Sequence, residues 1–485
     1  MKSVLLKYQN LPITAKASLW FLLCSFLQKG IAVITTPIFT RLLTPSEYGQ
    51  IAAFISWYSV IGVIVSLNLA SGVYTAAMVK FKNERIVLAS SYQGLTLFLC
   101  LLWLFIYLLF IDFWNELFSL TTAQMLAMLT MIWSSAAFSL WCIEQRVIYN
   151  YKKLVTITAV VSIVSPITGV VLVLFCEDKV TARILGMAVV NFIAYAGLSA
   201  WQMLRGKQLV SKRFWLYALQ FNLPLVPHAL SQTVLSSSDR IMIQNLVGNT
   251  EAGFYSLAYS ISLIMIIFNT SISQSLAPWT YQKLKENRVE ELNGVAVFTI
   301  GCVAILNFLL IIFAPEVICI FAPLEYLEAA YIIPPVAVSV YFMFLYDWFA
   351  RFEYYYEKTK YILVASLIGA VSNVILNYIF IPKFGYMAAG YTTFVCYGIY
   401  CFMHYSFMSK ICRINLPGRK VYNIKQILII SITLITCAFF VLFTYKSILI
   451  RYGICAVIII IVLSKRVLVM MKIKELLYIR KIGGR

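Results

Sequence analysis

The sequence predicts an all-α, polytopic membrane protein with about fourteen transmembrane helices. Of the 485 residues, 62% are hydrophobic and only 12% are charged, which differs strongly from a soluble domain. Apolar runs of about 20 residues recur from end to end, as membrane-spanning helices require. Lys and Arg occur in short clusters between these runs, so the net charge of +20 does not indicate nucleic-acid binding.

The predicted spans follow one another through the whole chain, and the loops between them are too short to form a separate soluble domain. The first span is too long for the core of a signal peptide and is followed directly by others, so we expect it to be retained. The spans cover residues 17–39, 50–76, 88–110, 122–143, 154–176, 183–203, 217–239, 254–279, 293–314, 331–352, 361–381, 387–409, 426–444 and 449–464.

The distribution of basic residues predicts the orientation. If the N-terminus is cytoplasmic, most of the 39 Lys and Arg residues fall in inner loops and in the two termini, as the positive-inside rule requires. An odd number of spans would place the basic tail, residues 465–485, on the opposite side. The pattern therefore favours an even number of spans, with both termini in the cytoplasm.

The chain also resembles itself. Residues 42–49, LLTPSEYG, align with residues 246–253, LVGNTEAG, so that Gly49 meets Gly253. The same offset aligns Ser56 with Ser260. Because six predicted spans separate the copies, both copies insert in the same orientation, as a parallel repeat about an axis along the membrane normal.

This repeat predicts three regions: an N-terminal lobe at 1–210 with spans 1–6, a C-terminal lobe at 211–410 with spans 7–12, and residues 411–485 with two further spans and the basic tail. Two parallel six-helix lobes that face each other can enclose a cavity that opens to either side of the membrane. The expected activity is therefore transport by alternating access.

Two polar residues lie deep within predicted spans and are candidates for contact with the substrate. Lys29 lies about 18 Å into the first span at 1.5 Å per residue, near the membrane midplane. His228 lies at a similar depth in span seven. Charged groups at this depth are costly and commonly functional. Alternatively, Lys29 reaches an interface with its long side chain, and His228 serves the backbone carbonyls that Pro224 and Pro227 leave free.

A further acidic and basic pair lies on span ten. Asp347 and Arg351 are four residues apart and share one helix face. We expect Arg351 to contact the substrate, and Asp347, Glu144 and His228 to be candidates for binding a coupling ion. A solvated ion pair is the alternative interpretation of Asp347 and Arg351.

Three charged residues near the outer ends of the spans are expected to act as gating or structural contacts. They are Arg41, Asp239 and Arg240. Because Asp239 and Arg240 are sequence neighbours, they do not face each other along a helix, and we expect their partners on other elements.

Motifs for several other activities are absent from the sequence. There is no GxxxxGK[ST] loop, so ATP hydrolysis by that route is excluded, and an ion gradient is the expected energy source. With two histidines and no CxxC pair among the eleven cysteines, we expect no metal site and no cofactor.

Several segments resemble signatures of Wzx-type flippases, which belong to the polysaccharide transporter family of the multidrug/oligosaccharidyl-lipid/polysaccharide (MOP) exporter superfamily. The matching segments are 40–49 (TRLLTPSEYG), 222–227 (NLPLVP), 238–240 (SDR), 253–256 (GFYS) and 381–390 (IPKFGYMAAG). The resemblance implies a fold like that of the multidrug and toxin extrusion (MATE) transporters.

It also implies a transporter rather than an enzyme. Such a protein moves undecaprenyl-pyrophosphate-linked oligosaccharide units, of O-antigen or a related surface polysaccharide, from the cytoplasmic to the periplasmic leaflet of a bacterial inner membrane. This is a step of lipopolysaccharide biosynthesis, with a polysaccharide polymerase and a chain-length regulator as candidate partners. Two alternatives stay open: a MATE-like multidrug or cation antiporter, and a membrane-embedded O-antigen polymerase or acyltransferase.

Overall fold

A computed structural model of the chain describes residues 12–464. Within that range the chain forms helices joined by short turns and contains no β-strand, which confirms the predicted all-α class. The predictions that concern residues 1–11 and the basic tail at 465–485 lie outside the described residues.

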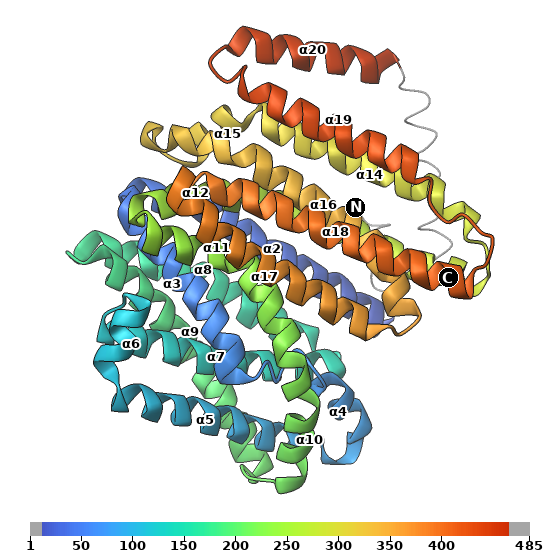
Figure 1. Cartoon of the computed structure of the whole chain (residues 1–485). Coiled ribbons are helices and arrows are strands. Elements are labelled where there is room, and N and C mark those ends of the chain that lie inside the picture. Colours follow the sequence, from blue (N-terminus) through green and yellow to red (C-terminus); the bar gives the residue numbers. More distant parts are fainter. Residues whose placement is uncertain (1–11, 465–485) are drawn as a thin grey trace, which may run out of the picture. The chain divides into compact units, whose positions relative to one another are not determined.

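The chain divides into two compact units, residues 1–253 and 254–485. The helices of the first unit follow one another as labelled in Figure 1. They are α2 (Ile13–Leu42), α3 (Pro45–Ser66), α4 (Tyr74–Lys80), η1 (Lys82–Glu84), α5 (Arg85–Leu109), α6 (Ile111–Phe118), α7 (Thr122–Val147), α8 (Tyr151–Phe175), α9 (Lys179–Gly206), α10 (Lys212–Asn222), η2 (Leu223–Leu225) and α11 (Val226–Leu246).

The second unit begins within α12 (Asn249–Ser262), and its helices α14, α16, α18 and α19 pack on one another. Its remaining elements and bounds are α13 (Ile264–Lys285), α14 (Glu290–Ile312), α15 (Ala314–Phe321), η3 (Leu324–Ile332), α16 (Ile333–Tyr355), α17 (Thr359–Phe384), α18 (Ala388–Asn415), α19 (Ile424–Leu442) and α20 (Ile448–Ser464).

In the described part of the chain, 11 helical segments are long and apolar enough to cross a membrane. The protein is therefore a polytopic membrane protein, as predicted. The other three predicted spans correspond to the interrupted pair α10 and α11, to α18, and to α20. The count of fourteen spans stays a prediction, and so do the lobe boundaries at 210 and 410.

Two predicted spans of the first unit are interrupted, and the interruptions meet. The predicted span 50–76 was expected to be continuous, but α3 ends at Ser66, where Leu67 and Asn68 adopt positive φ values of 47° and 51°. The turn continues to α4. It contacts the second break, because a Cβ on Gly72 would overlap the side chain of Asn222, at the end of α10.

The second interruption has an evident cause in the sequence. Pro224 and Pro227 lack a backbone N–H, and their rings clash with the preceding helical turn. Accordingly α10 ends at Asn222 and α11 begins at Val226 after one short 3₁₀ turn. The helix also ends later than predicted: α11 continues to Leu246, so Asp239 and Arg240 lie within it rather than at its outer end.

The segment between α2 and α3 is held by a capping box. The hydroxyl of Thr44 accepts a hydrogen bond from the N–H of Glu47 (3.3 Å), and the Glu47 carboxylate accepts one from the N–H of Thr44 (2.8 Å). Pro45 occupies the first helical turn, where its missing N–H costs nothing. Most of the segment 40–49 is thus explained by the start of α3.

Gly49, the last residue of that segment, lies at a helix crossing. A Cβ on Gly49 would overlap the carbonyl oxygen of Asn249, and a Cβ on Gly253 would overlap the carbonyl oxygen of Pro45. Both glycines are buried. Pro45 and Asn249 are equivalent positions of the sequence repeat, as are the two glycines. The contact is therefore reciprocal, as at a two-fold axis.

We predict that Gly49→Ala and Gly253→Ala each lower stability, because each added methyl meets backbone that cannot rotate away. Overpacking of this kind costs about 1–3 kcal/mol. The measurement is the thermal unfolding midpoint of the purified full-length protein in detergent.

The matched control is Gly197→Ala in α9, where an added Cβ meets nothing within 4 Å. Because alanine is the better helix former, this change should be neutral or stabilising by up to about 1 kcal/mol. Equal thermal unfolding midpoints for Gly49→Ala and Gly197→Ala would contradict the close contact of Gly49 with the backbone of Asn249.

Candidate functional site

The first unit contains a cavity of about 490 Å³, a volume typical of ligand sites. Helices α2, α4, α7 and α8 and the turn after α3 form its wall. Non-helical backbone within a membrane is tolerated where it lines such a cavity, so the early end of α3 is compatible with a position inside the membrane. Its polar lining residues are Gln28, Ser71, Thr75, Ser139, Arg146 and Thr158.

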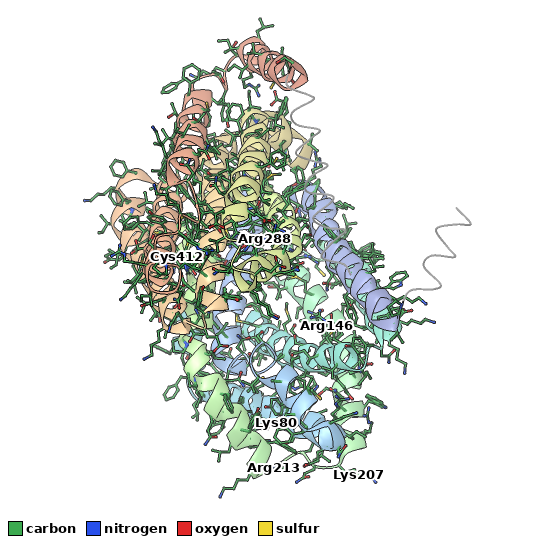
Figure 2. All side chains as sticks on the ribbon, turned by 90° about the vertical axis from the view of Figure 1, so that its right-hand side faces the viewer. Lys80, Arg146, Lys207, Arg213, Arg288 and Cys412 are labelled. Carbon is green, nitrogen blue, oxygen red and sulfur yellow. The ribbon has the colours of Figure 1, made fainter. Side chains whose placement is uncertain are left out.

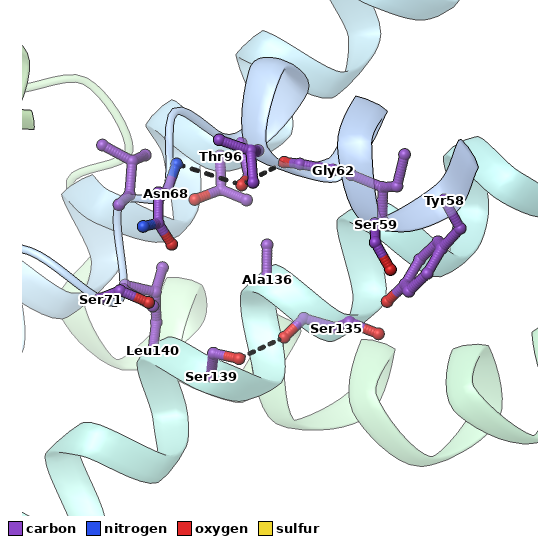
Figure 3. A pocket seen from close by; sticks show the side chains of 15 residues that line it. Tyr58, Ser59, Gly62, Asn68, Ser71, Thr96, Ser135, Ala136, Ser139 and Leu140 are labelled. Carbon is purple, nitrogen blue, oxygen red and sulfur yellow. Dashed lines mark hydrogen bonds between the residues drawn. The ribbon is translucent and has the colours of Figure 1, made fainter. Parts of the chain in front are cut away.

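A second cavity of about 200 Å³ adjoins the first, because Ala70, Ser71 and Ser139 line both. Figure 3 shows its hydroxyl groups facing the space between α3 and α7. Several of these hydroxyls donate to their own helix: Ser139 to the Ser135 carbonyl (2.8 Å) and Ser59 to the Ile55 carbonyl (2.8 Å). Their oxygen lone pairs remain available, so this wall offers mainly hydrogen-bond acceptors.

Arg146, near the end of α7, is the charged group on the wall of the larger cavity. Its guanidinium lies 5.7 Å from the ring centroid of Phe21, and no carboxylate among residues 12–464 forms an ion pair with it. It lies apart from the cluster of Lys80 and Arg213 (Figure 2), whose side chains pack on Phe81. The guanidinium supplies the donors that the hydroxyl wall lacks.

Glu144, a predicted coupling-ion candidate, is buried in a network behind this cavity. One carboxylate oxygen lies 3.3 Å from the Arg205 guanidinium, and the other accepts a hydrogen bond from Gln202. Gln93 donates in turn to the Gln202 side-chain oxygen (2.6 Å). Both oxygens of Glu144 thus have partners on α9. This favours a structural role, in which Glu144 acts as a clamp that holds α7 against α9. Ion binding by Glu144 stays a prediction.

The two residues predicted deepest in the membrane lie in different settings. Lys29 is near the middle of α2, which is 30 residues long. Its side chain is exposed and forms no ion pair among the described residues. Its neighbour Gln28 lines the larger cavity, whereas Lys29 lines neither cavity. His228 is half-buried in the first turn of α11, next to the proline break.

The predicted gate residues take part in local contacts. Arg41 donates to the Pro37 carbonyl (2.9 Å) in the last turn of α2, and Arg240 donates to the Ser236 carbonyl (3.1 Å). Asp239 is buried, with 1% of its surface exposed. A gating role for these three residues stays a prediction.

In the second unit the structure brings Asp347 and Arg351 together. Their side chains form an ion pair of 3.0 Å. The solvated alternative does not describe Arg351, which is 2% exposed and also donates to the hydroxyls of Ser273 (2.9 Å) and Thr280 (3.1 Å). Asp347 is partly exposed and accepts a second hydrogen bond, from Ser273.

Two functional candidates were not predicted from the sequence. Arg146 was not among the predicted site residues, because its place on a cavity wall depends on the early end of α3. Glu353 and His404 form a buried pair between α16 and α18, with Nδ1 of His404 2.7 Å from Oε1 of Glu353. A signal was present, because His404 is one of only two histidines and lies inside an apolar run.

Comparison with known families and proteins identifies the relatives of this chain. A sequence profile of the family described as "Polysaccharide biosynthesis protein" matches residues 14–284, more than half of the chain. A profile of the MatE family matches residues 224–379.

Two proteins of Haemophilus influenzae are similar in sequence. A protein of the Lsg locus is 24% identical over 208 residues, which are 41% of this chain and 50% of that protein. An uncharacterised membrane protein is 23% identical over 270 residues, 51% of this chain and 66% of that protein. The chain thus spans between half and two thirds of the length of these relatives.

Two solved structures share the fold. The lipid II flippase MurJ, in an inward closed conformation, superposes with a TM-score of 0.68 and 16% identity, covering 94% of this chain and 100% of that one. A MATE-family multidrug resistance transporter, in an inward-facing conformation, superposes with a TM-score of 0.63 and 12% identity, covering 81% and 96%. These similarities confirm the predicted MATE-like fold.

We predict that Glu144→Gln destabilises the protein by about 1–3 kcal/mol, because it removes a buried charged acceptor from Gln202 and Arg205. Thermal unfolding of purified Glu144→Gln, Arg205→Gln and the double variant measures this. The double variant should lose less than the sum of the single losses, because both changes break the same contact.

The exposed pair of Glu84 and Arg213, 3.0 Å apart, is the matched control. Because exposed ion pairs contribute about 0–1 kcal/mol, Glu84→Gln should change the unfolding midpoint little. Strictly additive losses at Glu144 and Arg205 would contradict the clamp.

Proposed function

The chain belongs to the polysaccharide biosynthesis protein family of the MOP exporter superfamily, and from this premise we propose that it is a flippase for polyprenyl-pyrophosphate-linked oligosaccharides. The proposed substrate is an undecaprenyl-pyrophosphate-linked repeat unit of O-antigen or a related surface polysaccharide. Movement is from the cytoplasmic to the periplasmic leaflet of a bacterial inner membrane, with both termini of the chain in the cytoplasm.

The observation that carries this proposal is the polar cavity of the first unit with Arg146 on its wall. A sugar presents many hydroxyl donors, and the wall formed by α3 and α7 presents hydroxyl oxygens whose own protons are already donated to the helix backbone. A pyrophosphate needs cationic donors, and Arg146 has no carboxylate that would compete for it among the described residues. Such a lining suits a polar, anionic headgroup better than an apolar cation.

Several further cations of the first unit have no carboxylate partner among the described residues, and two of them, Lys29 and Arg183, lie within predicted spans. Lys29 lies midway along α2, and the guanidinium of Arg183, near the start of α9, stacks 3.9 Å from the ring centroid of Phe39. If the predicted orientation holds, Arg146, Lys29 and Arg183 lie at the inner end, the middle and the outer end of the unit. We propose that the pyrophosphate passes these cations in that order.

The energy source in this proposal is an ion gradient, because the chain has no ATP-binding loop. Its candidate partners are a polysaccharide polymerase and a chain-length regulator, which would act on the unit after it reaches the periplasmic leaflet.

A MATE-like multidrug antiporter is the second candidate, favoured by the match of residues 224–379 to the MatE family. Expression in a drug-sensitive strain separates the two candidates. An antiporter raises resistance to cationic drugs without changing the surface glycan. A flippase changes the surface glycan and leaves resistance to these drugs unchanged.

Deletion of the gene tests the proposed function. Loss of a flippase traps single lipid-linked units in the cytoplasmic leaflet and removes long-chain surface polysaccharide. The measurement is a gel of the surface polysaccharide together with labelling of the lipid-linked units by a membrane-impermeant reagent. Single units that the reagent reaches in deleted cells would instead indicate a polymerase.

We predict that Arg146→Gln and Lys29→Ala each reduce long-chain polysaccharide sharply in the deletion strain, because each removes a cation from the proposed path of the pyrophosphate. The reduction should be about 10-fold or more, which corresponds to the loss of one charged hydrogen bond of about 1.5–3 kcal/mol. The measurement is complementation by each variant, at matched protein level.

Lys152→Ala is the control, since Lys152 is an exposed lysine at the start of α8 and belongs to neither cavity. It should complement like the wild type. Normal polysaccharide with Arg146→Gln at normal protein level would contradict a role of the cavity in substrate binding. The same outcome with Lys29→Ala would contradict a role of Lys29 on the path of the pyrophosphate.

A further inference from the structure

Glu353 and His404 form a buried titratable pair in the second unit. Their side chains are 0% and 1% exposed, and they join α16 to α18, two helices that pack on each other. A carboxylate without compensation would cost several kcal/mol at such a site. The 2.7 Å contact between Nδ1 of His404 and Oε1 of Glu353 supplies that compensation when the imidazole carries the proton.

The pair is not saturated with hydrogen bonds. Oε2 of Glu353 and Nε2 of His404 have no hydrogen-bond partner among the described residues. Buried polar groups are nearly always hydrogen-bonded, so each exception needs an explanation. In Glu144, by contrast, both carboxylate oxygens have partners. The pair therefore differs from a purely structural clamp, because each member keeps an atom that can take up or release a proton.

Aromatic rings surround the imidazole. The ring of Tyr346 stacks on it at 5.3 Å between centroids, and the ring of Tyr400 meets it edge-on at 4.5 Å. The face of Tyr346 can stabilise an imidazolium cation. His404 and Tyr354 are the titratable groups that interact electrostatically with Glu353. Asp347, Tyr354, Tyr400 and Cys401 lie around Tyr346, the ring that stacks on the imidazole.

Asp347 and Arg351 lie close to Glu353 along α16 but form a separate contact. Asp347 is partly exposed and bonded to Ser273 and Arg351. Arg351 precedes Glu353 by two residues and is itself buried, so the two side chains leave the helix on different faces. The guanidinium of Arg351 donates to Asp347, Ser273 and Thr280, and the Glu353 carboxylate contacts His404.

We propose that Glu353 and His404 form a proton-binding site whose protonation changes the packing of α16 on α18. With one proton the pair is a carboxylate and an imidazolium, joined by a charge-assisted hydrogen bond. A second proton, taken from water, binds the free carboxylate oxygen and gives a carboxylic acid beside an imidazolium. This step neutralises the acceptor, weakens the bond between the helices and leaves a net positive charge. Release of that proton to water restores the pair.

Use of this site to couple a proton gradient to transport rests on the proposed function. Binding of the proton does not, so the two claims are tested separately.

Infrared titration of the full-length protein in lipid nanodiscs tests proton binding. The wild type should show a carboxylic-acid band that disappears as the pH rises. Glu353→Gln should lose that band. His404→Gln should keep it but shift its midpoint toward higher pH, because the neighbouring imidazolium no longer stabilises the carboxylate. Glu328→Gln, which changes an exposed carboxylate, should match the wild type in this band.

An identical band in the wild type and Glu353→Gln, or the absence of a titrating buried carboxyl in the wild type, would overturn the proposal. If Glu353→Gln does not fold, His404→Gln decides, since an unchanged midpoint in that variant contradicts the pairing.

Proteoliposomes that contain a purified polyprenyl-pyrophosphate saccharide test the coupling. An imposed pH gradient should drive the saccharide to one leaflet with the wild type, whereas Glu353→Gln should equilibrate it between leaflets without responding to the gradient. Movement that ignores the gradient in the wild type overturns the coupling. No movement at all, with a normal infrared titration, overturns the proposed function and leaves the proton site standing.

Discussion

The reciprocal contact of Gly49 and Gly253 is the constraint on which the first unit depends. Each glycine lets its helix meet a backbone carbonyl of the equivalent segment. The two glycines lie in α3 and α12, and their close approach accompanies the packing of α3 on α11. It requires the chain to enter α3 and α12 at fixed angles. The capping box of Thr44 and Glu47 supplies one of these entries. Because α3 is fixed at this end, its early stop at Ser66 can open space for the polar cavity beside α7 without loss of the fold.

The polar groups of the interior differ in how many of their hydrogen-bonding atoms have partners. Glu144 and Arg351 have partners on neighbouring helices and hold those helices together. The buried pair of Glu353 and His404 keeps two atoms that the described residues do not use, and the same holds for Nε of Arg351, whereas Arg146 is exposed on the cavity wall. A buried polar group without a partner lowers stability unless a ligand or proton binds.

Much of the fold could be predicted from the sequence, because apolar runs, proline breaks and the offset of Gly49 and Gly253 are local or repetitive signals. The all-α class was predicted correctly, and the prolines that interrupt the span at 217–239 were recognised as freeing backbone carbonyls. The stop of α3 was not, because Leu67 and Asn68 are poor signals for a turn in an apolar run. The cavity and the Glu353–His404 pair were missed, since they depend on which faces of distant helices meet, and no local pattern records that. Lys29 was predicted from its depth alone, and depth does not determine which wall a side chain joins.

A direct measurement of lipid movement tests the central claim, that this chain carries a lipid-linked saccharide between leaflets. The purified full-length protein is reconstituted in liposomes with a polyprenyl-pyrophosphate-linked saccharide, and a membrane-impermeant enzyme that cleaves the outer saccharide is added. The account predicts that cleavage proceeds from the outer-leaflet fraction to nearly the whole pool. It also predicts that Arg146→Gln slows this second phase. Cleavage that stops at the outer-leaflet fraction, as in liposomes without protein, would contradict the account.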